Sequence, residues 1–150
     1  MNKLTHLDAR GEVNMVDVSV KPVALRQAVA RGEIRLQNAT LKLIQSHEIA
    51  KGNVLASARL AGIMAAKKTS DLIPLCHPLQ LSHCEVLFEI PKSQDRINII
   101  VSAKIAAQTG VEMEALTAVS VAALTIYDMC KAVDKKMSIT DIHLVSKTKK

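Results

Sequence analysis

Two stretches in the second half of the chain alternate between apolar and polar residues with a period of two. The first runs over 81–90 and places Val86 and Phe88 on the same side, and the second runs over 97–105. Such alternation is typical of β-strands that bury one face. Because only a short polar segment lies between them, at 93–95, the two stretches predict an antiparallel hairpin.

Weaker patterns predict three further strands and four helices. The valines between 16 and 20 alternate with polar residues and are followed by Lys21-Pro22, which ends a strand. The predicted short strands are 16–20, 34–36 and 139–146. The predicted helices are 23–30, 41–46, 54–67 and 111–133.

The helix expected over 54–67 has two distinctive features. Asn53 precedes it and is a favourable N-cap residue. Small residues recur along one side of the helix at helical spacing. They are Ala58, Ala61, Gly62 and Ala65. We therefore expect another backbone to pack closely against this helix.

The helix expected over 111–133 is unusually apolar. Thr109 and Glu112 have the spacing of a capping box, with Thr109 as N-cap. The thirteen residues of 115–127 carry no charge, but a stretch of thirteen residues is too short to cross a bilayer. A helix that is apolar on nearly every face is buried all round, so part of the burial is expected to come from a partner subunit.

These elements predict an α+β fold with an antiparallel sheet. The 150 residues, 49% of them hydrophobic and 23% charged, match a folded globular chain and exclude a disordered one. We expect one domain over 1–150, with an irregular arm at 1–12 and a basic tail at 147–150. No basic start followed by an apolar run opens the chain, so no secretory signal is expected, and three cysteines without disulfide-framework spacing indicate reduced thiols. The expected location is the cytoplasm.

The net charge of +6 suggests a polyanionic partner, which could be nucleic acid, a membrane surface or a phosphorylated small molecule. The only aromatic residues are Phe88 and Tyr127. Proteins that bind single-stranded nucleic acid need aromatic rings on which bases stack, so this composition argues against that class.

Asp128 and Lys131 are the first candidate site, because residues three apart lie on one face of a helix. An ordinary surface ion pair is an equal alternative, but the apolar neighbours of the pair favour partial desolvation and tunable acid/base chemistry. Glu114 lies fourteen positions earlier, about 21 Å along the axis. One small substrate cannot touch Glu114 and Asp128 of the same helix, so use of both would require two subunits.

Two other segments could carry a site. Prolines exclude helix and central strand from 74–78, and this loop either encloses an inert cysteine or fixes His77 and nearby amides against a ligand. The adjacent Cys76 and His77 do not have zinc-ligand spacing, so no metal site is predicted. Lys51 before a capped helix is either solvated or part of an anion site at the helix start.

Taken together, five segments resemble one known family, the cyclic pyranopterin monophosphate synthases, or protein C family, of molybdenum cofactor biosynthesis. The resemblance extends over roughly residues 4–147. The segments that carry it are 15–19 (MVDVS), 58–63 (ARLAGI), 71–79 (DLIPLCHPL), 109–117 (TGVEMEALT) and 127–133 (YDMCKAV).

The resemblance implies a ferredoxin-like fold and a homo-hexamer built as three dimers, with the active site at the dimer interface. It implies conversion of 3′,8-cyclo-7,8-dihydro-GTP, the product of a radical-SAM GTP cyclase, into cyclic pyranopterin monophosphate with release of pyrophosphate. No organic cofactor, membrane or nucleic acid is implied. A Mg²⁺ ion could accompany the triphosphate, but no protein ligand set in the sequence indicates one. The alternative is a catalytically silent oligomer that binds nucleotide or nucleic acid.

The resemblance also assigns site residues. Asp128, Lys131 and Lys51 are implied to be catalytic. Seven residues are implied to bind substrate: Leu75, Cys76, His77, Glu112, Met113, Glu114 and Lys147. One departure concerns the C-terminal segment, where the family commonly has a glycine-rich stretch and this sequence has Ser-Lys-Thr-Lys-Lys over 146–150.

Overall fold

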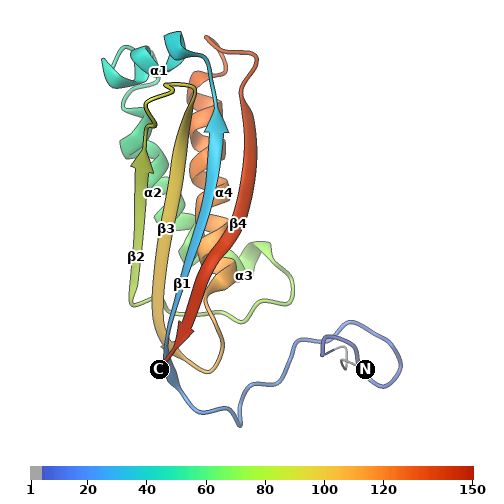
Figure 1. Cartoon of the computed structure of the whole chain (residues 1–150). Helices are drawn as coiled ribbons and strands as arrows, with labels where there is room; N and C mark the ends of the chain where they lie inside the picture. The colour runs from blue at the N-terminus through green and yellow to red at the C-terminus, as the bar shows by residue number, and fades with distance from the viewer. Residues whose placement is uncertain (1–4) are drawn as a thin grey trace.

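A computed structural model describes residues 5–150 of the chain and shows four strands and four helices (Figure 1). The strands are β1 (Ala24–Arg35), β2 (His83–Glu89), β3 (Arg96–Ala107) and β4 (Ser138–Lys149). The helices are α1 (Asn38–Gln45), α2 (Val54–Lys67), α3 (Thr69–Leu72) and α4 (Glu112–Cys130).

The four strands form one antiparallel sheet in the order β2-β3-β1-β4. Arg31 in β1 pairs with Ile100 in β3 on one side and with His143 in β4 on the other. The chain order β-α-β-β-α-β around such a sheet is the ferredoxin-like arrangement. The predicted α+β fold, the hairpin of β2 and β3, and the helix over 54–67 are all confirmed.

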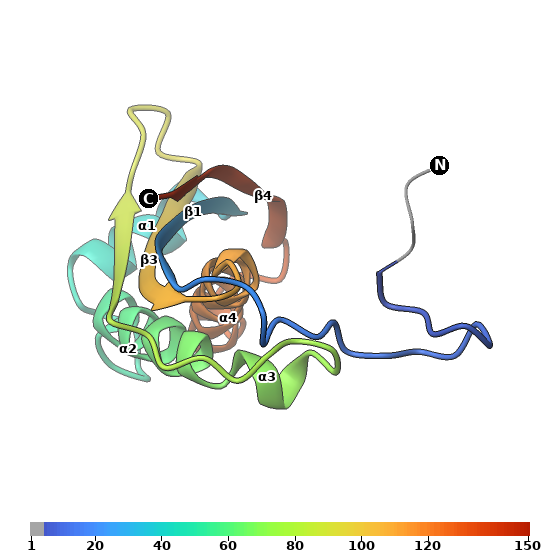
Figure 2. The ribbon, with the colours of Figure 1, turned by 90° about the horizontal axis from the view of Figure 1, so that it is seen from below.

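The helices α2 and α4 cover one face of the sheet and leave the other face open (Figure 2). Along β1, the residues on the helix side are Ala28, Ala30 and Ile34, and all three are buried. Gly32 lies on the same side, and a Cβ there would come within 2.7 Å of Val119 Cγ1 and 2.9 Å of Ile142 Cγ1. The small residues of β1 therefore let α4 lie close to the sheet.

This packing explains why the helix predicted over 23–30 is wrong. The segment is instead the first half of β1, and the short strand expected at 34–36 is its other end. Ala28 and Ala30 favour helix locally, but burial of one strand face against α4 outweighs that weak preference.

The close approach predicted for α2 is confirmed. Asn53 caps the helix by accepting a hydrogen bond from the Ala56 amide at 3.0 Å. A Cβ on Gly62 would lie 3.1 Å from the Ala118 carbonyl oxygen and 3.4 Å from Ala122 Cβ, both in α4. The two helices are thus in backbone contact at this position.

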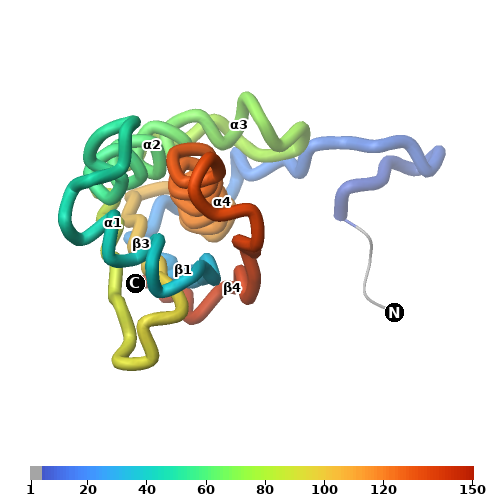
Figure 3. The backbone as a smooth tube through the Cα atoms, turned by 90° about the horizontal axis from the view of Figure 1, so that it is seen from above, coloured from blue at the N-terminus to red at the C-terminus, as the bar shows by residue number. Residues whose placement is uncertain are grey.

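The N-terminal arm leaves the body of the molecule beside α3 (Figures 1 and 3). It is irregular from residue 5 onward, as expected, apart from an isolated bridge between Leu7 and Val13. Residues 1–4 of the expected arm lie outside the described residues. The strand predicted at 16–20 is wrong, because no neighbouring strand pairs with it; Val16 and Val18 instead turn toward the loop at 75–79.

Two boundaries in the C-terminal third also differ from expectation. No side chain caps α4; its N-cap position is Val111, so the capping box of Thr109 and Glu112 is wrong. Helix α4 ends at Cys130 rather than 133, and β4 continues to Lys149, so most of the expected tail is strand. At the C-terminal end of β4, Lys149 pairs with Arg26 of β1.

Helix α4 is a core helix that is exposed along one side. It is long and apolar enough to span a membrane, but 56% of its most apolar stretch is buried against the rest of the chain. Met113, Leu124 and Asp128 are exposed in the single chain, so burial of this side of α4 by a partner subunit stays a prediction.

Candidate functional site

The structure brings together Lys51, Asp128 and Lys131 at the C-terminal end of α4. Lys51 Nζ donates to Asp128 Oδ2 at 2.9 Å and to the Asp128 backbone carbonyl, also at 2.9 Å. Lys131 Nζ lies 2.7 Å from the other carboxylate oxygen, Oδ1. One carboxylate therefore holds two ammonium groups, and we call these three residues the lysine–aspartate cluster.

Local backbone structure positions the cluster. Lys51 lies in the turn before α2, followed by Gly52 with φ +105° and by the capping residue Asn53. A side chain at Gly52 would be strained at this φ. Asp128 is in the last turn of α4, and Lys131 is the C-cap residue in helical conformation, so the i,i+3 spacing brings both side chains to one face.

Protonation states in the cluster follow from these contacts. The hydrogen bonds from Lys131 and Lys51 lower the pKa of Asp128 to about 2, and the bond to Asp128 raises the pKa of Lys131. At neutral pH the cluster is one carboxylate with at least one firmly protonated lysine. The expected desolvation is wrong, because the side chains of Lys51, Asp128 and Lys131 are 47%, 56% and 56% exposed.

The other predicted site residues meet at the N-terminal end of α4, around a cavity of about 430 Å³. We call this the arm cavity, because the N-terminal arm lines one side of it. The loop after α3 and the first turn of α4 supply the remaining walls. The predicted residues that line it are Leu75, Cys76, His77, Glu112, Met113 and Glu114.

The arm contributes residues that the sequence did not indicate: Thr5, His6, Val16, Val18 and Lys21. His77 Nε2 lies 2.7 Å from the Val16 carbonyl oxygen. A carbonyl only accepts, so Nε2 is the donor in this contact. The alternation of Val16 and Val18 is the available signal in the sequence, but by itself it predicts a strand.

Acidic groups in the arm cavity have shifted pKa values. Burial raises the pKa of Glu114, which is only 4% exposed, and nearby Glu112 raises it further. Burial also raises the pKa of Cys76, so its thiol stays protonated at neutral pH. Burial by itself would raise the pKa of Glu112, but hydrogen bonds from its own amide and from Lys147 outweigh this, and the pKa lies below its ordinary value.

Lys147 lies on β4 next to the arm cavity. Its Nζ is 3.0 Å from Glu112 Oε1, and both residues line a smaller adjoining cavity of about 250 Å³. Arg26 of β1 lines the same cavity and donates to the backbone carbonyls of Ala107 at 3.1 Å and Gln108 at 3.0 Å. Lys147 and Arg26 therefore place positive charge close to Glu112 at the N-terminal end of α4.

The two groups of residues do not meet within one chain. Glu114 and Asp128 are fourteen positions apart on one continuous helix, which corresponds to about 21 Å along its axis. The arm cavity and the lysine–aspartate cluster therefore lie at opposite ends of α4, as the spacing in the sequence predicted.

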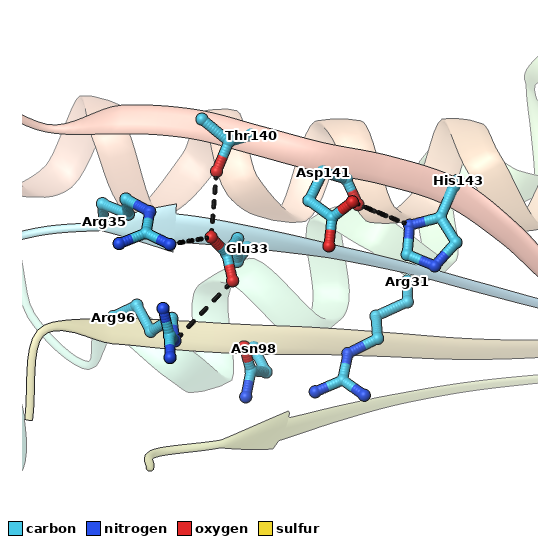
Figure 4. A pocket seen from close by; sticks show the side chains of 8 residues that line it. All are labelled: Arg31, Glu33, Arg35, Arg96, Asn98, Thr140, Asp141 and His143. Atoms are coloured by element: carbon cyan, nitrogen blue, oxygen red, sulfur yellow. Dashed lines mark hydrogen bonds and ion pairs between the residues drawn. The ribbon is translucent and has the colours of Figure 1, made fainter. Parts of the chain in front are cut away.

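A third hollow of about 680 Å³ lies on the open face of the sheet (Figure 4). Glu33 at its centre pairs with Arg35 at 2.9 Å and Arg96 at 3.7 Å and accepts from Thr140 at 3.1 Å. Glu33 is therefore held by two cations and a hydroxyl, and Arg31, Asn98, Asp141 and His143 complete the lining of the hollow. Among residues 5–150, no group of three or more His, Cys, Asp or Glu side chains is placed to hold a metal ion.

Comparison with known proteins gives consistent matches. The MoaC family matches residues 15–150. The chain is 58% identical over 146 residues to the cyclic pyranopterin monophosphate synthase of Parvibaculum lavamentivorans, covering 97% of this chain and 91% of that protein. The enzymes of the same name from Desulforapulum autotrophicum and Heliobacterium modesticaldum are 59% and 57% identical over 148 residues, 99% of this chain and 91% and 93% of theirs.

Proposed function

The chain belongs to the MoaC family and is a cyclic pyranopterin monophosphate synthase of molybdenum cofactor biosynthesis, and we propose that it acts on 3′,8-cyclo-7,8-dihydro-GTP with release of pyrophosphate. The observation that carries this proposal is the lysine–aspartate cluster, in which one carboxylate holds Lys51 and Lys131 at 2.9 and 2.7 Å. Two ammonium groups held together on an exposed surface can receive a phosphorylated substrate without a large desolvation cost.

In this proposal Lys131 is the proton donor of the reaction. Its raised pKa keeps it protonated at neutral pH, and rearrangement of the purine into a pterin needs several proton transfers. Asp128, with a pKa of about 2, is a weak base in the free chain. Asp128 first positions both lysines, and it becomes a better proton acceptor once the substrate phosphates draw the Lys131 ammonium group away.

Lys51 stabilises the developing negative charge. Closure of the cyclic phosphate requires attack of a ribose hydroxyl on the α-phosphorus, while pyrophosphate leaves with the bonding electrons. This step therefore requires cations beside the phosphates, where negative charge develops. Lys51 Nζ can exchange its bond to the Asp128 backbone carbonyl for a phosphate oxygen at little cost, because it keeps the carboxylate contact.

The arm cavity takes the base and sugar part of the substrate. Glu114 and Met113 at the start of α4 face the purine, and His77 with Cys76 and Leu75 form the opposite wall. A buried carboxyl with a raised pKa, such as Glu114, can act as donor or acceptor toward purine nitrogens. Glu112 and Lys147, paired at 3.0 Å, lie at the border with the adjoining cavity and would meet the triphosphate.

The wider proposal includes assembly and location. One domain over 1–150 forms a homo-hexamer of three dimers in the cytoplasm, with each active site at a dimer interface, and receives its substrate from a radical-SAM GTP cyclase. The separation of the two groups of residues along α4 supports a site shared between subunits. No organic cofactor is required, and any Mg²⁺ would arrive with the triphosphate.

The test is direct conversion of the cyclic dihydro-GTP intermediate. Purified protein is supplied with this intermediate, and pyrophosphate and the pterin product are measured. Product formation at enzymatic rates is expected. Absence of product from well-folded protein, when a synthase of known activity converts the same preparation, would overturn the proposal.

A further inference from the structure

The hollow on the open face of the sheet is separated by the sheet itself from α4, which packs against the other face. Its volume of about 680 Å³ is within the range of sites for small ligands. All eight side chains that line it are polar or charged, and Figure 4 shows them on the face of the sheet away from the helices. An apolar occupant would leave these groups without hydrogen-bond partners, so a polar ligand fits better.

A bulge in β4 turns additional side chains into this hollow. On β1, Arg31 and Glu33 are two positions apart, while their partners on β4, His143 and Thr140, are three positions apart. Asp141 lies in the bulge with φ 56°, in the left-handed region that residues other than glycine seldom adopt. As a result, Thr140, Asp141 and His143 all line the hollow, whereas regular alternation would place Thr140 on the face opposite the other two.

Most of the charge in the hollow is paired, but one arginine is not. Glu33 is held by Arg35 at 2.9 Å and by Arg96 at 3.7 Å, and nearby Asp95 lies 3.8 Å from each of these arginines. Among residues 5–150, the Arg31 side chain forms no ion pair and no hydrogen bond, and Figure 4 shows it extended from β1 across β3. The hollow therefore contains one guanidinium group whose donors no described residue uses.

Two further polar groups lie beside Arg31. Asn98 is only 9% exposed, and its side-chain amide makes no hydrogen bond within residues 5–150. His143 Nδ1 donates to the Asp141 carbonyl at 2.8 Å, which fixes the ring and leaves Nε2 on its other edge. Arg31 pairs with His143 on β4 and with Ile100 on β3, and Asn98 is two positions from Ile100. Residues in this register are neighbours on one sheet face, so the three side chains converge on one part of the hollow.

We propose that Arg31, Asn98 and His143 bind a phosphate group, either as the free anion or as the ester of a small molecule, at a site that the proposed reaction does not use. A guanidinium presents paired donors that match two oxygens of a phosphate, and an amide supplies a third. A bound anion favours the protonated imidazole, in which Nε2 is also a donor. The Asp141 carboxylate, 3.4 Å from Nδ1, favours the same charged form. Donors on three neighbouring strands suit a tetrahedral phosphate better than a planar carboxylate.

The first test is chemical modification of Arg31 in the full chain. Phenylglyoxal modifies accessible arginines, and mass spectrometry of the digested protein gives the rate at each one. Inorganic phosphate, added at constant ionic strength, is expected to slow modification of Arg31 by about tenfold or more at saturation. Arg10 is the control within the same molecule, because it is exposed and does not line the hollow, and its rate should not change.

Variants connect this protection to the proposed ligands. Asn98→Ala and His143→Gln should each require about tenfold more phosphate for the same protection of Arg31, because each variant removes one donor. Lys131→Ala should require no more phosphate than wild type, since the lysine–aspartate cluster is a different site. Circular dichroism checks that each variant is folded. Equal protection of Arg31 in wild type, Asn98→Ala and His143→Gln would overturn the assignment of these side chains.

Pyrophosphate and guanosine monophosphate distinguish the two sources of the phosphate group. Stronger protection by the free anions assigns the hollow to free phosphate, and stronger protection by the nucleotide assigns it to a phosphate ester. An Arg31 that reacts equally fast with and without all three compounds would overturn the proposal. So would an Arg31 that resists phenylglyoxal in their absence, because another protein surface would then cover the hollow. The measurement needs no turnover, so its result is independent of the proposed activity.

Discussion

The carboxylate of Asp128 lies 2.9 Å from Lys51 Nζ, although 77 positions separate the two residues in the sequence. Lys51 also donates to the Asp128 backbone carbonyl, so it is tied to the last turn of α4 at two points. Only the packing of α2 against α4 brings the turn before one helix to the end of the other. The pairing of Asp128 with Lys131, by contrast, follows from helical spacing alone.

Asp128→Asn should reduce product formation about 100-fold or more, in line with loss of an acid/base group. The amide keeps the shape but no longer neutralises two lysines, so both ammonium groups lose their common partner. Turnover of the cyclic dihydro-GTP intermediate is the measurement. Asp141→Asn is the matched control, since this exposed residue has φ 56°, which Asn tolerates well. Equal turnover in both variants would remove Asp128 from the reaction.

Lys131→Ala should abolish product while keeping the wild-type mass and fold. The side chain is exposed and contacts Asp128 rather than the core, so its removal costs the structure little. Turnover and light scattering are measured on the same preparation, with Lys135→Ala as a control that removes an exposed lysine nearby. Wild-type turnover in Lys131→Ala would contradict its role as proton donor.

The Asp128 carboxyl should titrate near pH 2 in the free protein, because hydrogen bonds from Lys131 and Lys51 lower its pKa to about 2. A pKa below its ordinary value of 3.8 means that the carboxylate stabilises the fold above about pH 4 and that this contribution is lost as the pH falls toward 2. Carboxyl-detected NMR follows the titration. In Lys131→Ala the midpoint should move upward, and an unchanged midpoint would show that the contact does not form in solution.

Glu114→Gln should melt at a higher temperature than wild type at pH 8. Burial raises the pKa of Glu114, so the folded state favours the protonated form; its stabilising contribution is present below the ordinary value of 4.5 and is lost as the pH rises. The neutral amide avoids that loss. Thermal unfolding is followed between pH 4 and pH 8, and the advantage of the variant should shrink as the pH falls. A constant difference across this range would rule out ionisation as its cause.

Asp134→Ala should lower the free energy of unfolding by about 2–4 kcal/mol, because it removes a buried carboxylate that three donors share and leaves the buried Thr40 hydroxyl without this partner. The buried Asp134 carboxylate accepts from the Gln37 amide at 2.9 Å, the Thr40 hydroxyl at 3.0 Å and the Lys136 amide at 2.9 Å. Urea unfolding at a fixed protein concentration is the measurement, with the exposed Asp71→Ala as a control expected within about 0.5 kcal/mol of wild type. A similar small change for Asp134→Ala would contradict this account.

The pattern of apolar and polar residues determined those parts of the fold in which one element alone carries a strong period. The hairpin of β2 and β3, the span and cap of α2, and the presence of one long apolar helix were all predictable, because a period of two or 3.6 and an N-cap are local properties. The resemblance of the segments 71–79, 109–117 and 127–133 to a known family could likewise be recognised from the sequence alone.

Tertiary structure decided what depends on partners elsewhere in the chain. β1 has the local composition of a helix at 24–30 and becomes a strand because β3 and β4 pair with it and α4 packs on its small residues. Val16 and Val18 alternate as in a strand but find no strand to pair with. They line the arm cavity instead, where the Val16 carbonyl holds His77.

The same distinction applies to the candidate site. The sequence by itself determined which residues could carry the chemistry, and helical geometry alone already separated Glu114 from Asp128 along α4. Only the fold decided that Lys51 joins Asp128, that the cluster is exposed rather than desolvated, and that Glu112 pairs with Lys147 instead of capping its helix. Contacts between distant segments depend on how whole elements pack, and no local pattern encodes that packing.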